Sequence, residues 1–197
     1  MSLLDDQVRA ADLDRWLASR LVDDAERRAD LIALYAFFNE LKAVPTRARQ
    51  PVLAEMRYGW WAEHLDGAFS GEPRKGHPVL ERLALAVSRR DLPRQPFDGL
   101  IDAWVQAAHG QPLEPAERER LELELATGVL GGAGGADLQP VARLLETGEG
   151  RGEANRALRR LPAAAFPAVA HAALIASSAP EPLRRLKLLW ATLRGRI

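Results

Sequence analysis

Residues 23–41 restrict the fold more than any other part of the sequence, because they are apolar around most of a helical circumference. Leu31, Leu34 and Phe38 share one face of this segment, and further apolar residues cover much of the remaining surface. A helix that is hydrophobic on most sides is stable only where other elements surround it. The sequence therefore predicts a helix at the centre of a helical bundle.

The ends of this central helix have their own signals. Asp23 is followed three residues later by Glu26, which matches a capping box and predicts the start of the helix. Pro45 lacks the N–H that a helix interior needs, so it predicts the end. Pro51 suits the first position of the next helix, where that N–H would have no partner in any case.

The rest of the chain shows the helical period in shorter segments that proline and glycine separate. Predicted helices cover residues 51–68, 78–90, 97–108, 115–130, 137–145, 155–161, 166–177 and 183–193. No run alternates apolar and polar residues as a half-buried strand does, so no sheet is predicted. Short connections favour antiparallel neighbours. We therefore predict an all-α fold in which residues 1–197 form one helical domain.

Composition excludes several classes of function. Lys plus Arg and Asp plus Glu are both 27, so no overall positive charge favours nucleic acid, and no nucleic-acid partner is expected. The chain has no cysteine, which excludes disulfides and thiolate zinc sites and suits a reducing cytoplasm. Its four histidines are scattered without metal-ligand spacing. We expect no metal site and no cofactor.

The hydropathy pattern predicts a soluble cytoplasmic protein. The N-terminal residues lack the basic stretch and apolar run of a secretory signal, so none is expected. No stretch approaches the roughly 18 apolar residues that a membrane-spanning helix needs. The protein is still able to lie against a membrane surface, and a location peripheral to the inner membrane is compatible with this pattern.

Asp98 and Asp102 are the one acidic pair with useful spacing. Residues four apart lie on one helical face, so the two carboxylates suit a metal–diphosphate site. They also fit an ordinary role, because carboxylates near the start of a helix interact favourably with its positive end. Both interpretations stay open from sequence.

The last predicted helix is basic and amphipathic. Its cations and its tryptophan, which interleave with leucines, are Arg184, Arg185, Lys187, Trp190 and Arg194. Such a helix binds an anionic membrane surface or a membrane-associated protein complex. The alternative is a bundle helix whose basic face is simply solvated.

Two segments resemble a known family. Residues 34–39 are similar to the family's L-Y-A-F-C-R, and residues 51–61 to its E-P-x-L-x-E-x-R-x-x-W-W, as in the squalene/phytoene synthase family. The resemblance is collinear over most of the chain. It implies an α-helical isoprenoid (prenyl) synthase bundle, here truncated. Active members condense two isoprenoid diphosphates head to head, with Mg²⁺ held by two D-x-x-x-D motifs.

Both acidic motifs are missing from this chain. Lys42, Ala43 and Thr46 stand where the first motif has aspartates, and Asn39 replaces the family arginine. Residues 143–161 contain no aspartate pair for the second motif. Because a lysine cannot ligate Mg²⁺, the resemblance implies no catalytic residues and a need for Mg²⁺ only if residual activity exists.

The resemblance therefore implies a catalytically degenerate member that works as a binding or assembly factor, most similar to the respiratory complex I assembly branch. Two alternatives remain. One is a prenyl-diphosphate transferase with an unorthodox site, and the other is a carrier for a prenyl diphosphate or lipid. The candidate pocket residues for these functions are Tyr35, Phe38, Asn39, Lys42, Arg57, Trp60, Asp98 and Asp102. For the aromatic residues among them, plain core packing is the competing interpretation.

Overall fold

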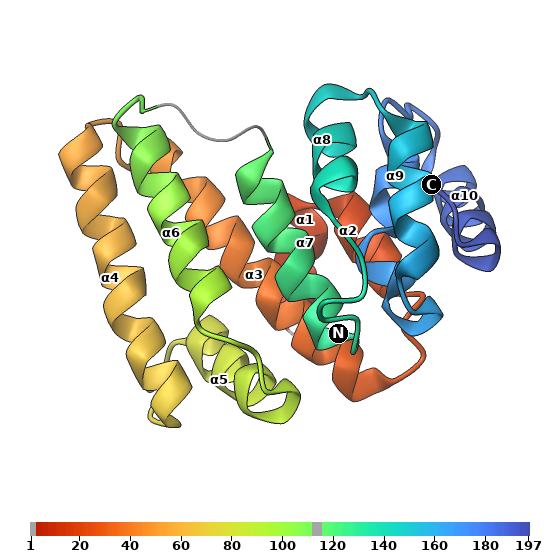
Figure 1. Cartoon of the computed structure of the whole chain (residues 1–197). Helices are drawn as coiled ribbons and strands as arrows, with labels where there is room; N and C mark the ends of the chain where they lie inside the picture. Colours follow the sequence, from red (N-terminus) through yellow and green to blue (C-terminus); the bar gives the residue numbers. More distant parts are fainter. Residues whose placement is uncertain (1–2, 112–115) are drawn as a thin grey trace.

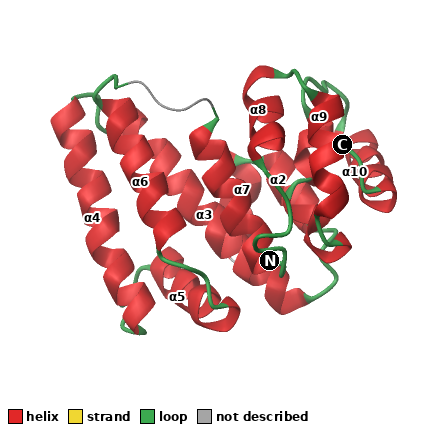
Figure 2. Ribbon diagram, in the orientation of Figure 1, coloured by secondary structure: helices red, strands yellow, loops and turns green. Residues whose placement is uncertain are grey.

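All regular secondary structure is helical in the residues that the computed structural model describes, 3–111 and 116–197 (Figure 1). Its elements are α1 (Leu3–Ala11), α2 (Leu13–Ser19), α3 (Ala25–Arg47), α4 (Pro51–Ser70), α5 (Pro78–Arg90), α6 (Gln95–Ala108), α7 (Glu117–Val129), α8 (Gln139–Thr147), α9 (Arg151–Ala157), the 3₁₀ helices η1 (Leu158–Arg160), η2 (Ala163–Ala168) and η3 (Ala170–Leu174), and α10 (Glu181–Arg194). No strand occurs in the described residues (Figure 2), so the predicted all-α fold is confirmed.

Helix α3 lies at the centre of the arrangement, as its sequence predicts. Residues 31–38 are all buried, and eight consecutive residues cover every side of a helix. The helices α1, α2, α4, α5, α6 and α7 all contact α3. One continuous cluster of buried apolar side chains extends from α1 to α10. That the whole chain forms one domain stays a prediction.

The start of α3 differs from the prediction by one residue. Asp24, rather than Asp23, caps the helix, and its Oδ1 accepts a hydrogen bond from the Arg27 N–H at 2.7 Å. Both aspartates precede the helix and either has a suitable side chain. The sequence pattern favoured Asp23 because Glu26, three residues later, completes a capping box with it.

The predicted end of α3 is wrong, because the helix continues through Pro45 to Arg47. A proline inside a helix leaves the carbonyl four residues earlier without its N–H partner, which here is the carbonyl of Leu41. The buried hydroxyl of Tyr58 on α4 donates to that Leu41 oxygen at 3.3 Å. Burial raises the pKa of Tyr58 to about 12, so the phenol remains a donor. A side chain thus supplies the bond that the backbone lost.

The C-terminal part is more irregular than predicted. The predicted helix 155–161 is instead the end of α9 followed by η1, and the predicted helix 166–177 falls on η2 and η3, with Pro167 inside η2. The start of the predicted helix 115–130 lies outside the described residues, and α7 is observed from Glu117. The sequence analysis did not predict α1 and α2.

Among the described residues, no helix is both long and apolar enough to cross a membrane.

The Tyr58–Leu41 bond generates a test of the helix through Pro45. We expect Tyr58→Phe to lower the free energy of unfolding by about 1–3 kcal/mol, since a buried carbonyl loses its donor. In a Pro45→Ala background the backbone N–H restored at position 45 can satisfy Leu41, so the same substitution should cost less than half as much. Urea denaturation of the four proteins measures the difference, and equal costs in both backgrounds would show that the hydroxyl does not replace the backbone bond.

Candidate functional site

The C-terminal half of α3 carries two opposite faces. At about 100° per residue, the positions of the missing acidic motif fall on the side of Tyr35, and Glu40 falls on the other. We call the first side the motif face, with Tyr35, Phe38, Asn39 and Lys42. We call the second the groove face, with Glu40, Val44 and Arg47. The sequence-predicted pocket residues are therefore divided between separate environments.

The motif face packs against an arginine from α2. The Arg15 guanidinium lies over the rings of Tyr35 and Phe38, with 5.8 Å from its central carbon to each ring centroid. Tyr35, Phe38 and Arg15 are all buried, whereas Asn39 is half-buried and Lys42 is exposed. The two aromatic rings thus pack in the core around a cation. Both rings therefore contact Arg15.

Two carboxylates of α7 hold the Arg15 side chain. Its Nη1 is 2.5 Å from Oε2 of Glu122, and its Nη2 donates to Oε2 of Glu119 at 3.0 Å. Burial acts to lower the pKa of Arg15, but Glu122 and Glu119 outweigh it and raise the pKa overall. Burial raises the pKa of Glu122, while Arg15 and, less strongly, Lys42 oppose that rise. The arginine therefore stays charged, and the buried carboxylate depends on it.

Several polar atoms near this ion pair have no hydrogen-bond partner in the described residues. They are the Tyr35 hydroxyl, the Asn39 Nδ2 and both ring nitrogens of His171. Burial and, less strongly, the charge of Arg15 lower the pKa of His171 to about 3. His171 on η3 is therefore neutral at physiological pH.

The residues at the motif positions do not fit Mg²⁺. Lys42 supplies an ammonium, Ala43 has no donor, and the Thr46 hydroxyl donates to the Ala43 carbonyl at 2.7 Å. Mg²⁺ requires oxygen ligands, usually carboxylates, in octahedral geometry. In residues 3–111 and 116–197, no group of three or more His, Asp or Glu side chains is placed to hold a metal ion.

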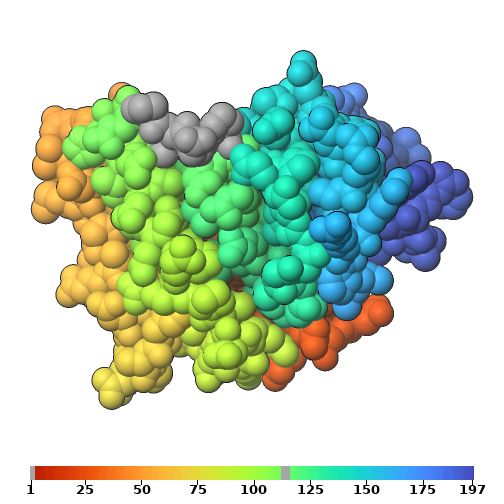
Figure 3. All heavy atoms as spheres, viewed as in Figure 1, coloured from red at the N-terminus to blue at the C-terminus, as the bar shows by residue number. Residues whose placement is uncertain are grey.

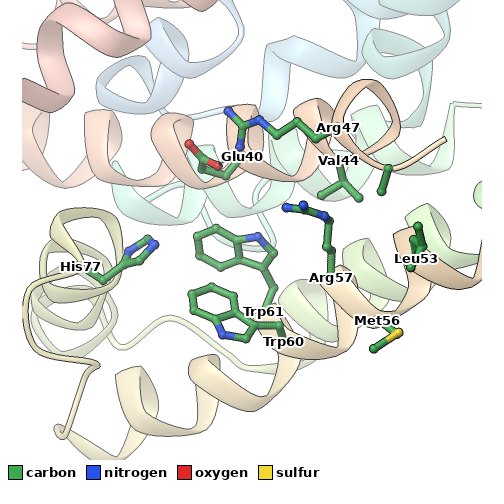
Figure 4. Close-up of a pocket in the computed structure, with 10 residues that line it drawn as sticks. Glu40, Val44, Arg47, Leu53, Met56, Arg57, Trp60, Trp61 and His77 are labelled. Atoms are coloured by element: carbon green, nitrogen blue, oxygen red, sulfur yellow. Dashed lines mark hydrogen bonds and ion pairs between the residues drawn. The ribbon is translucent and has the colours of Figure 1, made fainter. Parts of the chain in front are cut away.

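The groove face borders a hollow between α3 and α4 (Figure 4). Its volume is about 530 Å³, which is within the range of small-ligand sites. Val44 and Trp61 form buried parts of its wall, while Leu53 and Met56 are largely exposed beside it. Arg57 and Trp60, two of the predicted pocket residues, line this groove rather than the interior.

The charged side chains of the groove have partners, except for Arg57. Arg47 donates to Glu40 at 2.7 Å, and burial lowers the pKa of His77, the residue that caps α5. Trp60 stacks on His64 with ring centroids 4.0 Å apart. Arg57 is exposed and has no ion pair or hydrogen bond in the described structure. The groove therefore offers apolar surface beside one free cation, which suits an amphipathic partner with an acidic group.

Asp98 and Asp102 lie on α6, and neither bonds to Arg57. The Asp98 carboxylate accepts from Arg94 Nε at 2.7 Å, and Arg94 also bonds to Asp66 at 2.7 Å. Asp102 is exposed. These contacts make Asp98 part of a surface ion-pair network that links α6 to α4.

Of the five surface residues predicted on the last helix, four are exposed and one turns toward the core. Lys187, Trp190 and Arg194 are exposed on α10, and Arg185 is exposed while bonding to Glu181 at 2.6 Å. Arg184 instead turns toward the core and donates to Asp14 at 2.6 Å. It attaches the helix and does not belong to the outer surface.

The sequence analysis missed Arg15, Glu122 and His171. A signal existed, because Arg15 precedes Trp16 and Leu17 in an apolar stretch, and Glu122 lies between two leucines. A charge within an apolar helix needs a partner of opposite sign. The sequence does not show which of the many acidic residues that partner is.

A family model described as squalene/phytoene synthase matches residues 8–123, which is more than half of the chain. The match runs from α1 into α7 and includes both faces of α3 and the groove. It does not include α8, α9 or α10. No curated protein and no solved structure gives a significant match.

The buried ion pair predicts a large, partner-dependent effect on stability. We expect Arg15→Met to lower the free energy of unfolding by about 3–5 kcal/mol, because Glu122 keeps its burial and loses its cation. The double variant Arg15→Met/Glu122→Leu should recover most of this loss. Arg120→Met, which breaks a more exposed pair with Glu117, should cost less than about 1 kcal/mol in the same urea titration. A double variant as unstable as the single one would contradict the coupling.

His171 predicts a loss of stability in acid. Its folded pKa lies below the unfolded value of about 6.5, so its contribution is complete above pH 6.5 and declines as the pH falls toward about 3. From pH 7.5 to pH 5.5 this contribution should fall by about 1.4 kcal/mol. We expect His171→Gln to remove that part of the pH dependence, as measured by urea denaturation at both pH values. An unchanged slope would show that another group causes it.

Proposed function

The chain belongs to the squalene/phytoene synthase family, and we propose that it is a catalytically degenerate member that works as a non-enzymatic binding or assembly factor. In this function it is comparable to the respiratory complex I assembly branch of the family. We place it in the cytoplasm, peripheral to the inner membrane. The partner is a membrane-associated protein complex.

The observation that carries the proposal is the content of the motif face. Prenyl transfer in this family needs carboxylates that hold Mg²⁺ against a leaving diphosphate. Here Lys42 and Ala43 stand at those positions, and the nearby buried carboxylate of Glu122 is already committed to Arg15. Tyr35 and Phe38 pack on that arginine. A chain with this interior lacks the ligands for the family reaction but keeps the helices that present its outer surfaces.

The groove between α3 and α4 supports a binding role. It combines apolar side chains with the free guanidinium of Arg57, and its neighbours Val52, Leu53 and Met56 are exposed. Exposed apolar residues that lie together are typical of a surface that another molecule covers. An acidic, amphipathic segment of a partner protein has the chemistry that this groove complements.

The test of lost catalysis uses the full chain with Mg²⁺ and farnesyl or geranylgeranyl diphosphate. We expect no pyrophosphate release above a protein-free blank, while an active squalene or phytoene synthase releases it under the same conditions. We also expect no rise in melting temperature with either diphosphate, because the motif positions carry no carboxylate to hold Mg²⁺ against it. Pyrophosphate release that Asp98→Asn abolishes would establish the transferase alternative. Stabilisation without turnover would establish the carrier alternative.

The binding role is tested by affinity capture from solubilised inner membranes. We expect the wild-type chain to retain respiratory-chain subunits and Arg57→Glu to lose most of them, because the substitution reverses the free charge of the groove. Arg82→Glu on the exposed surface of α5 is the matched control and should retain them. Equal capture by both variants would remove the groove from the proposal.

A further inference from the structure

Helix α10 presents its apolar side chains to solvent rather than to the core. Leu183, Leu186, Trp190 and Leu193 are 55%, 61%, 55% and 72% exposed. Spacings of three and four residues put them on one stripe, and Leu189 extends it along one edge. The helix lies at the edge of the molecule, at the far end from α4 (Figure 3). A stripe of five large apolar side chains is therefore without a partner in the described part of this fold.

The opposite side of the helix fixes this orientation. Leu188 and Ala191 are buried against η3, α2 and η2. Arg184 on the same side donates to the Ser177 carbonyl at 2.8 Å as well as to Asp14. After the helix, the Ile197 N–H donates to Asn155 Oδ1 at 2.9 Å. These contacts attach α10 along its length, so the outward stripe belongs to the folded state.

Cations border the stripe on both edges. At about 100° per residue, Lys187 and Arg194 fall along one edge and Arg185 along the other. The Arg194 guanidinium lies over the Trp190 ring, 4.1 Å from its centroid. Glu181 is the one carboxylate within α10, and it is already paired with Arg185 and Arg9. The surface thus combines an apolar centre, a tryptophan and a basic margin.

We propose that α10 is a docking surface for an anionic phospholipid bilayer, in which the helix lies flat at the level of the headgroups. Its leucines would enter the acyl region, Trp190 would lie at the boundary, and Lys187, Arg185 and Arg194 would meet lipid phosphates. Fourteen residues span about 21 Å, too short to cross the roughly 30 Å of hydrocarbon. The inference deepens the proposed function, on whose membrane-side location it rests, by naming the surface and the lipid class.

Charge argues against a second copy of the chain as the occupant. Two α10 stripes packed together would bring Lys187, Arg185 and Arg194 of both copies side by side. No carboxylate of α10 is left to neutralise them, because Glu181 is already paired. Like charges at such distances repel and oppose association. An anionic bilayer instead supplies negative charge along both edges at once.

The composition of the stripe also favours lipid over a protein partner. Its members are four leucines and one tryptophan, with no amide, hydroxyl or carboxylate side chain to give directional hydrogen bonds. Protein interfaces use such groups for specificity, whereas insertion into a bilayer requires only apolar area and cations at the headgroups. The binding should accordingly depend on lipid charge and ionic strength.

The test measures sedimentation of the full chain with vesicles of about three parts phosphatidylcholine to one part phosphatidylglycerol. We expect binding that phosphatidylcholine alone does not support and that raised salt weakens. Leu186→Gln should weaken the partition by about tenfold, since one buried leucine is lost. Lys187→Gln and Arg194→Gln should each weaken it by about fivefold. Leu85→Gln, at an exposed leucine of α5, is the matched control and should bind as the wild type does.

The outcomes separate lipid from the other occupants. Vesicle binding that Leu186→Gln leaves unchanged would overturn the proposal. So would a chain that is dimeric in analytical ultracentrifugation and becomes monomeric with Leu186→Gln while failing to bind vesicles. Binding to inner-membrane protein complexes without binding to protein-free vesicles would also overturn it, in favour of a protein partner. None of these readings involves pyrophosphate, so this proposal and the loss of catalysis can fail independently.

Discussion

The fold depends on the burial of α3 from every side. Residues 31–38 are all buried, and a helix buried on every side is stable only when other helices surround it, as six do here. The same requirement explains why Pro45 is tolerated. Tyr58 from a packed neighbour replaces the lost backbone bond, so the helix continues to Arg47. Because of that continuation, Glu40, Val44 and Arg47 form one wall of the groove while Lys42 remains on the motif face.

The buried charge beside the motif face is balanced within the protein. A magnesium site would balance several carboxylates with a divalent cation, and here one guanidinium balances Glu122 and Glu119. The lysine at position 42 is compatible with this balance, since its charge also acts to lower the pKa of Glu122. Arg15 packs beside Tyr35 and Phe38, on the same side of α3 as Lys42.

Features that depend on neighbouring residues could be predicted from the sequence, whereas features that depend on contacts between distant residues could not. Pro51 and Pro78 begin α4 and α5 as local rules predict, because helix starts depend on neighbouring residues. The Arg15–Glu122 pair joins residues more than a hundred positions apart, and no local pattern selects it. Likewise, the sequence shows that α10 is amphipathic, but it does not show which of its leucines are buried. The adjacent Leu188 and Leu189 are buried and exposed, respectively. Only the position of the core decides which side faces outward, and it placed Arg184 inside.

Most of the large apolar side chains that are exposed lie on two helices. In the described part of the chain, most large ones gather on α4, as Val52, Leu53 and Met56, or on the outer stripe of α10. These helices lie at opposite ends of the molecule (Figure 1), and they are attached to different neighbours. Occupying one surface therefore leaves the other accessible, so the proposed protein partner at the groove and the proposed bilayer at α10 can be bound at the same time. Neither of the two proposed contacts involves the motif face, so both are compatible with Arg15 packed against Tyr35 and Phe38.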